Sequence, residues 1–141
     1  MNVFISCVKS KKNKPSKASE LYISNLFKYS FRYALSLTKR DKIFILSAKY
    51  GLVKPDDIIQ PYELTLNNMN KRQRQEWAYK VYKQLVREGI DFDEETIFLC
   101  GKKYREFIIT KFTNAKTPLK NLGIGEQLKF YKEALNEKNK Q

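Results

Sequence analysis

Three short apolar runs place the strongest limit on how this chain can fold. They cover residues 2–8, 42–46 and 96–100 and are rich in β-branched and aromatic side chains. Nearly continuous apolar runs of this length are typical of strands buried on both faces of a sheet. Helix-like segments separate the runs, which favours parallel strands joined by right-handed crossovers. The sequence therefore predicts an α/β fold: a small three-layer sandwich with a mainly parallel sheet of three to four strands, covered by helices on both faces.

Four helices are expected around these strands, on the basis of apolar periodicity and end signals. Ser19 is the predicted cap of the first helix, and Gly89 is the predicted stop of the second. Two prolines should keep residues 52–68 irregular, and residues 116–122 are expected to include a short extended piece. The predicted helices cover residues 20–37, 70–88, 103–112 and 126–135.

Length and composition indicate one globular domain over residues 1–141, with a tail that frays after about residue 136. Two cysteines and no histidine argue for a reducing compartment and against a zinc site, so we expect neither a metal nor a cofactor. No apolar run approaches the roughly 20 residues of a membrane span, and the first residues lack the pattern of a secretion signal. The expected location is the cytoplasm, with no membrane partner.

The net charge points to the class of partner. The chain has 28 Lys and Arg residues against 15 Asp and Glu residues, a formal charge of +13. A charge of this size favours nucleic acid, and DNA in particular, as the partner. The alternative is a generally lysine-rich surface that has no specific partner.

The three predicted strands end in similar ways. In each, a small residue is followed two positions later by a lysine: Cys7 and Lys9, Ser47 and Lys49, Cys100 and Lys102. Parallel strands end at one edge of the sheet, so the three lysines could surround a single crevice that binds an anion such as a phosphate. The alternative is that they are solvated loop lysines.

A second cluster follows at residues 61–66, where Glu63 lies between Tyr62 and Thr65. A carboxylate in a basic pocket could orient water or stabilise a developing cation, although a salt bridge to a surface lysine would explain it equally well. Glu63, Lys49 and Ser47 are the predicted catalytic residues. The predicted substrate-binding residues are Cys7, Lys9, Ser10, Tyr50, Gly51, Tyr62, Thr65, Lys102 and Tyr104.

Several motifs together resemble a family of small bacterial and phage proteins of unknown function. They are Cys7-x-x-Ser10-Lys11, Glu20-Leu21-Tyr22-x-Ser24, Leu46-Ser47-Ala48-Lys49-Tyr50-Gly51-Leu52, Pro61-Tyr62-Glu63-x-Thr65-Leu66, Trp77-Ala78 and Leu119-x-x-Leu122-Gly123-Ile124-Gly125. The Ser-Ala-Lys-Tyr-Gly motif is also loosely similar to peroxide-stress proteins that bind DNA. The layout resembles the α/β sandwich of uracil-DNA glycosylases and a domain of archaeosine-forming enzymes, a likeness of fold alone. The histidine that assists base departure in uracil-DNA glycosylases has no counterpart in this chain.

These observations lead to one main functional hypothesis and two alternatives. The main one is a nucleic-acid-acting protein, a DNA glycosylase that excises a modified or unusual base after flipping it against Tyr50 or Tyr62. Glu63 would act on the sugar or on water, and a Schiff-base variant would use Lys49. The alternatives are a DNA-binding or nucleotide-sensing module without catalysis, and an enzyme that acts on free nucleotides or phosphoribosyl compounds.

Overall fold

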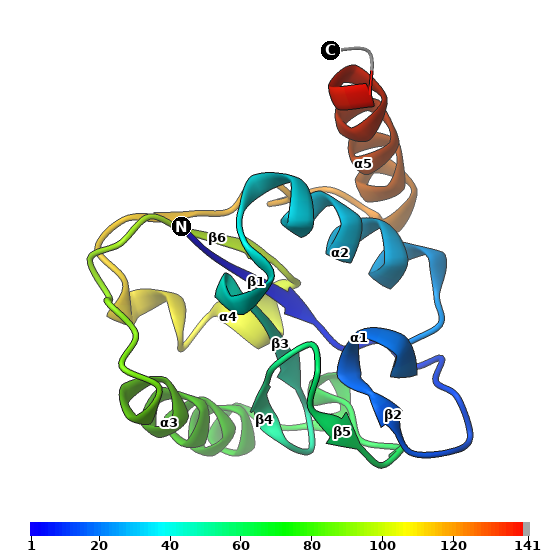
Figure 1. Cartoon of the computed structure of the whole chain (residues 1–141). Coiled ribbons are helices and arrows are strands. Elements are labelled where there is room, and N and C mark those ends of the chain that lie inside the picture. Colours follow the sequence, from blue (N-terminus) through cyan, green and yellow to red (C-terminus); the bar gives the residue numbers. More distant parts are fainter. Residues whose placement is uncertain (140–141) are drawn as a thin grey trace.

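A five-stranded sheet lies at the centre of the molecule (Figure 1). The computed structural model describes residues 1–139, and the strand order is β4-β3-β1-β6-β7. β3, β1, β6 and β7 are parallel, and β4 runs antiparallel to β3. The predicted α/β sandwich is confirmed, but the expected count of three to four strands is too low because β4 adds an antiparallel edge. The strands are β1 (Asn2–Ser6), β3 (Ile43–Ser47), β4 (Gly51–Val53), β6 (Thr96–Leu99) and β7 (Ala115–Lys116).

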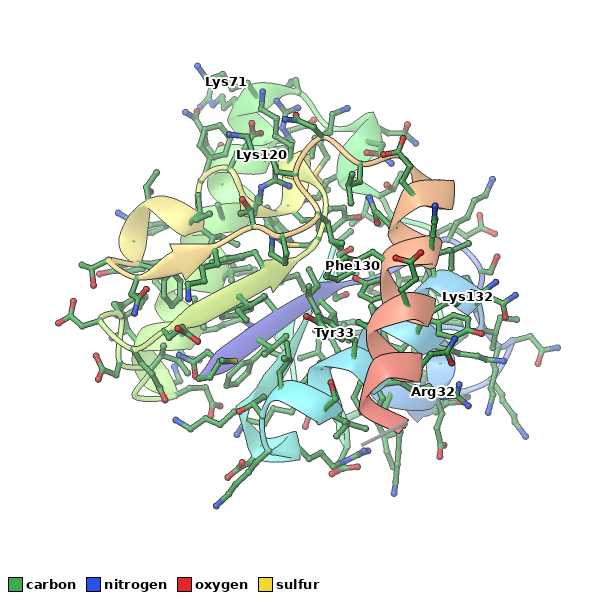
Figure 2. The ribbon with its side chains drawn as sticks, turned by 90° about the horizontal axis from the view of Figure 1, so that it is seen from above. Arg32, Tyr33, Lys71, Lys120, Phe130 and Lys132 are labelled. Atoms are coloured by element: carbon green, nitrogen blue, oxygen red, sulfur yellow. The ribbon has the colours of Figure 1, made fainter. Side chains whose placement is uncertain are left out.

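Helices cover both faces of the sheet, as the sequence predicts. α2 (Asn25–Leu37) contacts β1, and α5 (Ile124–Asn139) packs on α2. α3 (Lys71–Arg87) contacts β4 on the opposite side, where α4 (Lys102–Arg105) packs against it (Figure 1). Figure 2 shows α5 beside α2. Between them, Tyr33 of α2 and Phe130 of α5 make an edge contact, with ring centroids 5.4 Å apart.

A row of aromatic rings crosses the three central strands. Phe4 of β1 is in register with Phe44 of β3 and Phe98 of β6, and its ring stacks on both, at centroid distances of 5.4 and 5.0 Å. Phe112 closes the row with an edge contact to Phe4. Each buried Phe side chain stabilises the fold by about 1.5–3 kcal/mol, and each ring pair adds about 0.5–1.5 kcal/mol. The apolar runs thus form strands because their side chains pack against one another across the sheet.

The first predicted helix is in fact two helices. α1 (Ala18–Leu21) ends before Tyr22, and α2 begins after Ser24, whose hydroxyl accepts a hydrogen bond from Phe27 N at 3.2 Å. The predicted cap Ser19 is therefore wrong. The break arises because the basic loop after β1 returns and pairs with the connection between the helices: Lys12 N donates to Leu21 O and Ile23 N donates to Ser10 O. Such long-range pairing overrides the local helical periodicity.

The remaining predicted elements are closer to those of the structure. α3 is confirmed, with Asn70 and Gln73 forming a reciprocal capping box and Gly89 following at φ +73°. Residues 103–112 form only the short α4 and a 3-10 turn, η3 (Ile109–Lys111), so the predicted long helix is wrong there. The tail expected to fray begins within α5, and its last two residues lie outside the described part.

Short elements fill the segments that the sequence leaves irregular. The segment 52–68 contains most of β4, together with β5 and η2, but no long helix. β5 pairs with β2 in a separate two-stranded antiparallel sheet. Within residues 1–139, no helix combines the length and the apolarity that a membrane-spanning segment requires. The remaining short elements are β2 (Ser16–Lys17), β5 (Ile58–Ile59), η1 (Arg40–Lys42) and η2 (Leu66–Asn68).

Candidate functional site

Two adjoining cavities open where β1 and β6 end. The larger, the Tyr62 cavity, has a volume of about 710 Å³, and the smaller, the Cys100 cavity, about 400 Å³. Both volumes fall within the range of small-molecule sites, about 300–1,000 Å³. The cavities share a wall formed by Cys7, Val8, Asn67 and Tyr104. The remaining lining of the Tyr62 cavity is Lys9, Lys11, residues 62–65 and Asn68.

A set of hydrogen-bonded hydroxyls holds the Tyr62 side chain in place. The Tyr62 and Tyr22 hydroxyl oxygens lie 2.6 Å apart, and Ser47 Oγ donates to the Tyr62 hydroxyl at 2.8 Å. Burial raises the pKa values of Tyr22 and Tyr62 well above 10, so both phenols stay protonated at neutral pH. Ser47 is fully buried behind Tyr62 and does not line the Tyr62 cavity. Ser47 therefore supports Tyr62 through its hydrogen bond and does not itself face a ligand in this cavity.

Lys11 lies against the Tyr62 ring at the edge of the cavity. Its Nζ is 4.5 Å from the Tyr62 ring centroid and donates to Lys9 O at 3.1 Å. Burial lowers the pKa of this half-buried ammonium, an effect that Cys7 and Glu63 oppose. Lys11 is absent from the predicted site residues. The signal that could have found it is its place in the motif Cys7-x-x-Ser10-Lys11.

Glu63 lies at the exposed rim of the same cavity. Among the described residues, no basic side chain lies within ion-pair distance of its carboxylate, and no hydrogen bond engages it. The surface salt bridge considered from the sequence is therefore not observed, and Glu63 lines the cavity together with Lys9 and Lys11. Thr65, also predicted, lines the cavity while its hydroxyl accepts from Asn67 N at 3.2 Å. This edge of the sheet thus combines one acid, two amines and several neutral polar groups.

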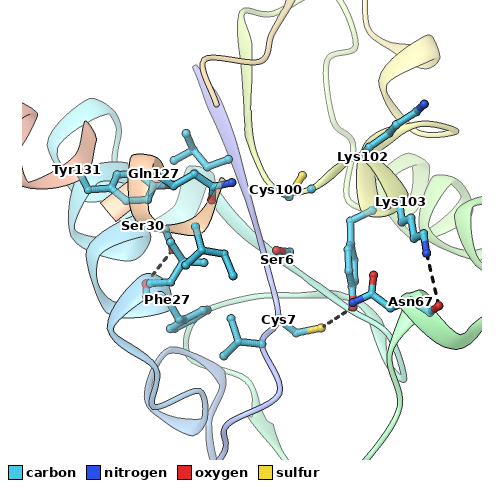
Figure 3. A pocket seen from close by; sticks show the side chains of 16 residues that line it. Ser6, Cys7, Phe27, Ser30, Asn67, Cys100, Lys102, Lys103, Gln127 and Tyr131 are labelled. Carbon is cyan, nitrogen blue, oxygen red and sulfur yellow. Dashed lines mark hydrogen bonds between the residues drawn. The ribbon is translucent and has the colours of Figure 1, made fainter. Parts of the chain in front are cut away.

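Tyr104 separates the two cavities. It comes from α4, and its hydroxyl accepts from Cys7 Sγ and from Leu66 N, each at 3.4 Å (Figure 3 shows the first contact). Burial raises the pKa of Tyr104 above its ordinary value of 10.0. Cys7 donates its S–H to this phenol, so the predicted residues Cys7 and Tyr104 form one contact in the shared wall.

Cys100 lies on the far side of that wall, in the Cys100 cavity. It is a free thiol, as is Cys7, and burial raises its pKa to about 12. A thiol with that pKa is not a nucleophile at neutral pH. Lys102 lines this smaller cavity, but Figure 3 shows its side chain extending away from Cys7 and Cys100. Among the described residues, no group of three His, Cys, Asp or Glu side chains is placed to hold a metal ion.

The Ser-Ala-Lys-Tyr-Gly motif forms a turn between β3 and β4 that α3 holds in place. Trp77 Nε1 donates to Ser47 O at 2.9 Å, and Lys80 Nζ donates to Lys49 O at 3.0 Å. Gln84 accepts from Leu52 N and donates to Tyr50 O, at 2.8 and 3.1 Å. Three backbone carbonyls and one backbone N–H of this segment are therefore bound by α3, so the motif has a structural role.

The predicted meeting of three lysines in one crevice is wrong. Lys9 lines the Tyr62 cavity, Lys102 lines the Cys100 cavity, and Lys49 lines neither. The Lys49 ammonium instead lies over the ring of Tyr50, 5.3 Å from its centroid. The strands do end at one edge as expected, but Lys49 belongs to the turn between β3 and β4 and does not line the cavities at the ends of β1 and β6. The two lysines that line one cavity are Lys9 and Lys11.

The remaining predicted binding residues lie outside both cavities. Ser10 is exposed, and its carbonyl accepts from Ile23 N. Gly51 is buried beneath α3, and Tyr50 packs edge-on against Tyr62 at a centroid distance of 5.7 Å. Of the predicted site residues, those that line the larger cavity are Cys7, Lys9, Tyr62, Glu63, Thr65 and Tyr104.

Comparison with known proteins places the chain in a family. The family model described as "Family of unknown function (DUF6884)" matches residues 3–133. The chain is 31% identical over 130 residues to the uncharacterized protein YfjM of Bacillus subtilis (strain 168), an alignment that covers 89% of this chain and 84% of that protein. It is also 31% identical over 112 residues to the UPF0246 protein MYPE6270 of Malacoplasma penetrans (strain HF-2), which covers 74% of this chain but 45% of that protein. No solved structure matches. The expected membership of a family of unknown function is thus confirmed: the chain belongs to the DUF6884 family.

Proposed function

We propose that this protein acts on nucleic acid by taking one nucleotide unit into the Tyr62 cavity, and that it hydrolyses the N-glycosidic bond of a modified or unusual base in DNA. The observation that carries the proposal is the grouping of Glu63 with Lys9 and Lys11 around one cavity that has an aromatic wall. Phosphate, sugar and base require a cation, a polar group and an apolar surface, and this cavity supplies all three.

Each part of a nucleotide has a candidate contact in the cavity. Lys9 is exposed at the rim, where it can reach a phosphate that stays in solvent. The base would pack against Tyr62, and the amides of Asn67 and Asn68 would hydrogen-bond its edge. Glu63 would then orient water or stabilise the positive charge that develops on the sugar as the base leaves.

The outer face of α3 supports binding of a long polyanion. Exposed cations follow this face along the helix, and the formal charge of the whole chain is +13. Each phosphate neutralised by such a residue should contribute a slope of about −0.9 to the dependence of log K on log salt. A steep salt dependence would favour nucleic acid over a free nucleotide. The cations are Lys71, Arg72, Lys80, Lys83 and Arg87.

The test is incubation with single- and double-stranded DNAs that carry different modified bases, followed by detection of abasic sites through alkaline strand cleavage. We expect abasic sites with at least one base, and a loss of about 10²–10⁴-fold in the rate for Glu63→Gln. Glu126→Gln is the matched control, because Glu126 is exposed at the start of α5 and lines neither cavity. Equal rates for Glu63→Gln and wild type would refute the assignment of Glu63.

A binding module without catalysis is the second candidate. The observation that favours it is that Glu63 is the one acid lining the Tyr62 cavity, so no second carboxyl in that lining can protonate a departing base. Salt-dependent DNA binding, weakened by Lys9→Ala and accompanied by no abasic site on any DNA tested, would support this candidate over the glycosylase.

A further inference from the structure

Lys11 is the amine best placed to react within the Tyr62 cavity. Its backbone forms a bridge with Tyr22, and its Nζ lies over the Tyr62 ring while donating to Lys9 O at 3.1 Å. Contacts of both its backbone and its side chain therefore hold the Lys11 ammonium in place. Lys49, the lysine that the sequence suggests for such a role, is exposed and lines neither cavity.

The surroundings of Lys11 also favour its neutral form. The groups that face its ammonium are Cys7, Glu63, Tyr22 and Tyr62. Burial lowers the pKa of Lys11, whereas Cys7 and Glu63 raise it, and burial is the larger effect. An amine attacks carbon only when it is neutral, and an ordinary lysine, with a pKa of about 10.4, is almost wholly protonated at pH 7.

We propose that Lys11 is the nucleophile that forms a covalent imine with C1′ of the nucleotide in the Tyr62 cavity. This inference rests on the proposed function and adds a catalytic residue to it. Glu63 lines the same cavity and is free to accept the proton that the Lys11 nitrogen loses on attack.

The bonds and protons balance without an oxidant or a reductant. The Lys11 Nζ lone pair forms a bond to C1′, and the electron pair of the N-glycosidic bond leaves with the base. Glu63 takes a proton from Nζ, and the base gains one from solvent. The C1′–O4′ bond then breaks, O4′ takes a proton from water, and an iminium joins Lys11 to C1′. Addition of water to C1′ releases the sugar as an aldehyde and restores the amine.

The experiment uses the full chain and DNA that already contains an abasic site. The aldehyde of that site forms the same imine, so the experiment does not depend on which base the protein excises. Sodium borohydride reduces the imine to a stable secondary amine, which is seen as a protein–DNA adduct on a denaturing gel and located by peptide mass spectrometry. We expect the adduct at Lys11. Lys11→Arg should lower its yield about tenfold or more, with its circular dichroism unchanged.

Lys14→Arg is the matched control, because Lys14 lies exposed in the same loop and lines neither cavity. Its adduct yield should equal that of wild type. Trapping by wild type should also begin at lower pH than trapping by a lysine peptide, since the amine with the lower pKa loses its proton first. An adduct that maps to other lysines, an adduct retained in full by Lys11→Arg, or no adduct at all would overturn the assignment of Lys11.

The result is separable from that of the glycosylase test. Base excision that is unaffected in Lys11→Arg and leaves no borohydride adduct would refute the imine and leave the proposed function in place. An adduct at Lys11 on abasic DNA, with no excision of any base tested, would support the nucleophile and count against base excision.

Discussion

Gly51→Ala should destabilise the turn that carries the Ser-Ala-Lys-Tyr-Gly motif. Gly51 has φ +77°, a left-handed conformation that costs other residues about 1–2 kcal/mol. A Cβ at this position would also collide with Gln84 Oε1, which accepts from Leu52 N at 2.8 Å. Displacing Gln84 would break that bond and the one to Tyr50 O, each worth about 0.5–1.5 kcal/mol. The sum is a loss of about 2–5 kcal/mol in the free energy of unfolding.

Urea denaturation followed by circular dichroism measures this loss. Gly125→Ala is the matched control: no atom lies within 4 Å of the added Cβ, and its place in the first turn of α5 should make the change neutral or slightly stabilising. In a Gln84→Ala background the collision is gone, so Gly51→Ala should cost only the backbone part, about 1–2 kcal/mol. A wild-type urea midpoint for Gly51→Ala, or an unchanged cost of Gly51→Ala in the Gln84→Ala background, would contradict the predicted collision and backbone strain at Gly51.

Three further predictions concern stability. Ser24→Ala removes the cap that accepts from Phe27 N and should cost about 1 kcal/mol in urea, whereas no change would argue against the break between α1 and α2. Tyr62→Phe leaves the buried Ser47 hydroxyl without its acceptor and should cost about 1–3 kcal/mol by the same assay; a neutral result would contradict the hydroxyl network. Burial raises the pKa of Cys100 from 9.0 to about 12, so the unfolded chain loses this proton at a lower pH than the folded chain does. The contribution of Cys100 to the free energy of unfolding is therefore fully present below pH 9 and is lost as the pH rises to 12. The urea midpoint of the wild type should therefore fall as the pH rises above 9, and that of Cys100→Ala should fall less steeply. Midpoints that do not change with pH would refute the raised pKa of Cys100.

The centre of the fold could be predicted from the sequence because its determinants are local. The apolar runs that contain Phe4, Phe44 and Phe98 are already strand-like, and their packing across the sheet reinforces that preference. The same holds for α3, where Asn70 and Gln73 are three residues apart and cap the helix by themselves. Such elements are recognisable because the sequence signal and the tertiary contact coincide.

The misplaced elements have determinants distant in sequence. The break between α1 and α2 depends on hydrogen bonds from the loop that follows β1, such as Lys12 N to Leu21 O. That pairing also carries Lys11 to the cavity, so one long-range event explains both the missed break and the missed residue. The prediction for Lys49 is wrong for a related reason: Lys49 lies in a turn whose backbone is bound by Lys80 of α3, and the spacing of the strands in the sequence does not reveal that contact.

The candidate site is built from two loops that meet on Tyr22. The backbone of Tyr22 forms a bridge with Lys11, and its hydroxyl lies 2.6 Å from that of Tyr62, so one buried residue fixes both loops. Ser47 supports Tyr62 from the end of β3, which ties the cavity wall to the central sheet. The Ser-Ala-Lys-Tyr-Gly motif therefore supports the fold, while the polar groups that line the cavity come from the two loops, at Lys9 and Lys11 and at residues 62–65, and from Asn67 and Asn68. The proposed attack on a bound sugar would depend on this hydrogen-bonded aromatic wall with an amine and a carboxylate beside it, because misplacement by about 1 Å can cost a hundredfold in rate.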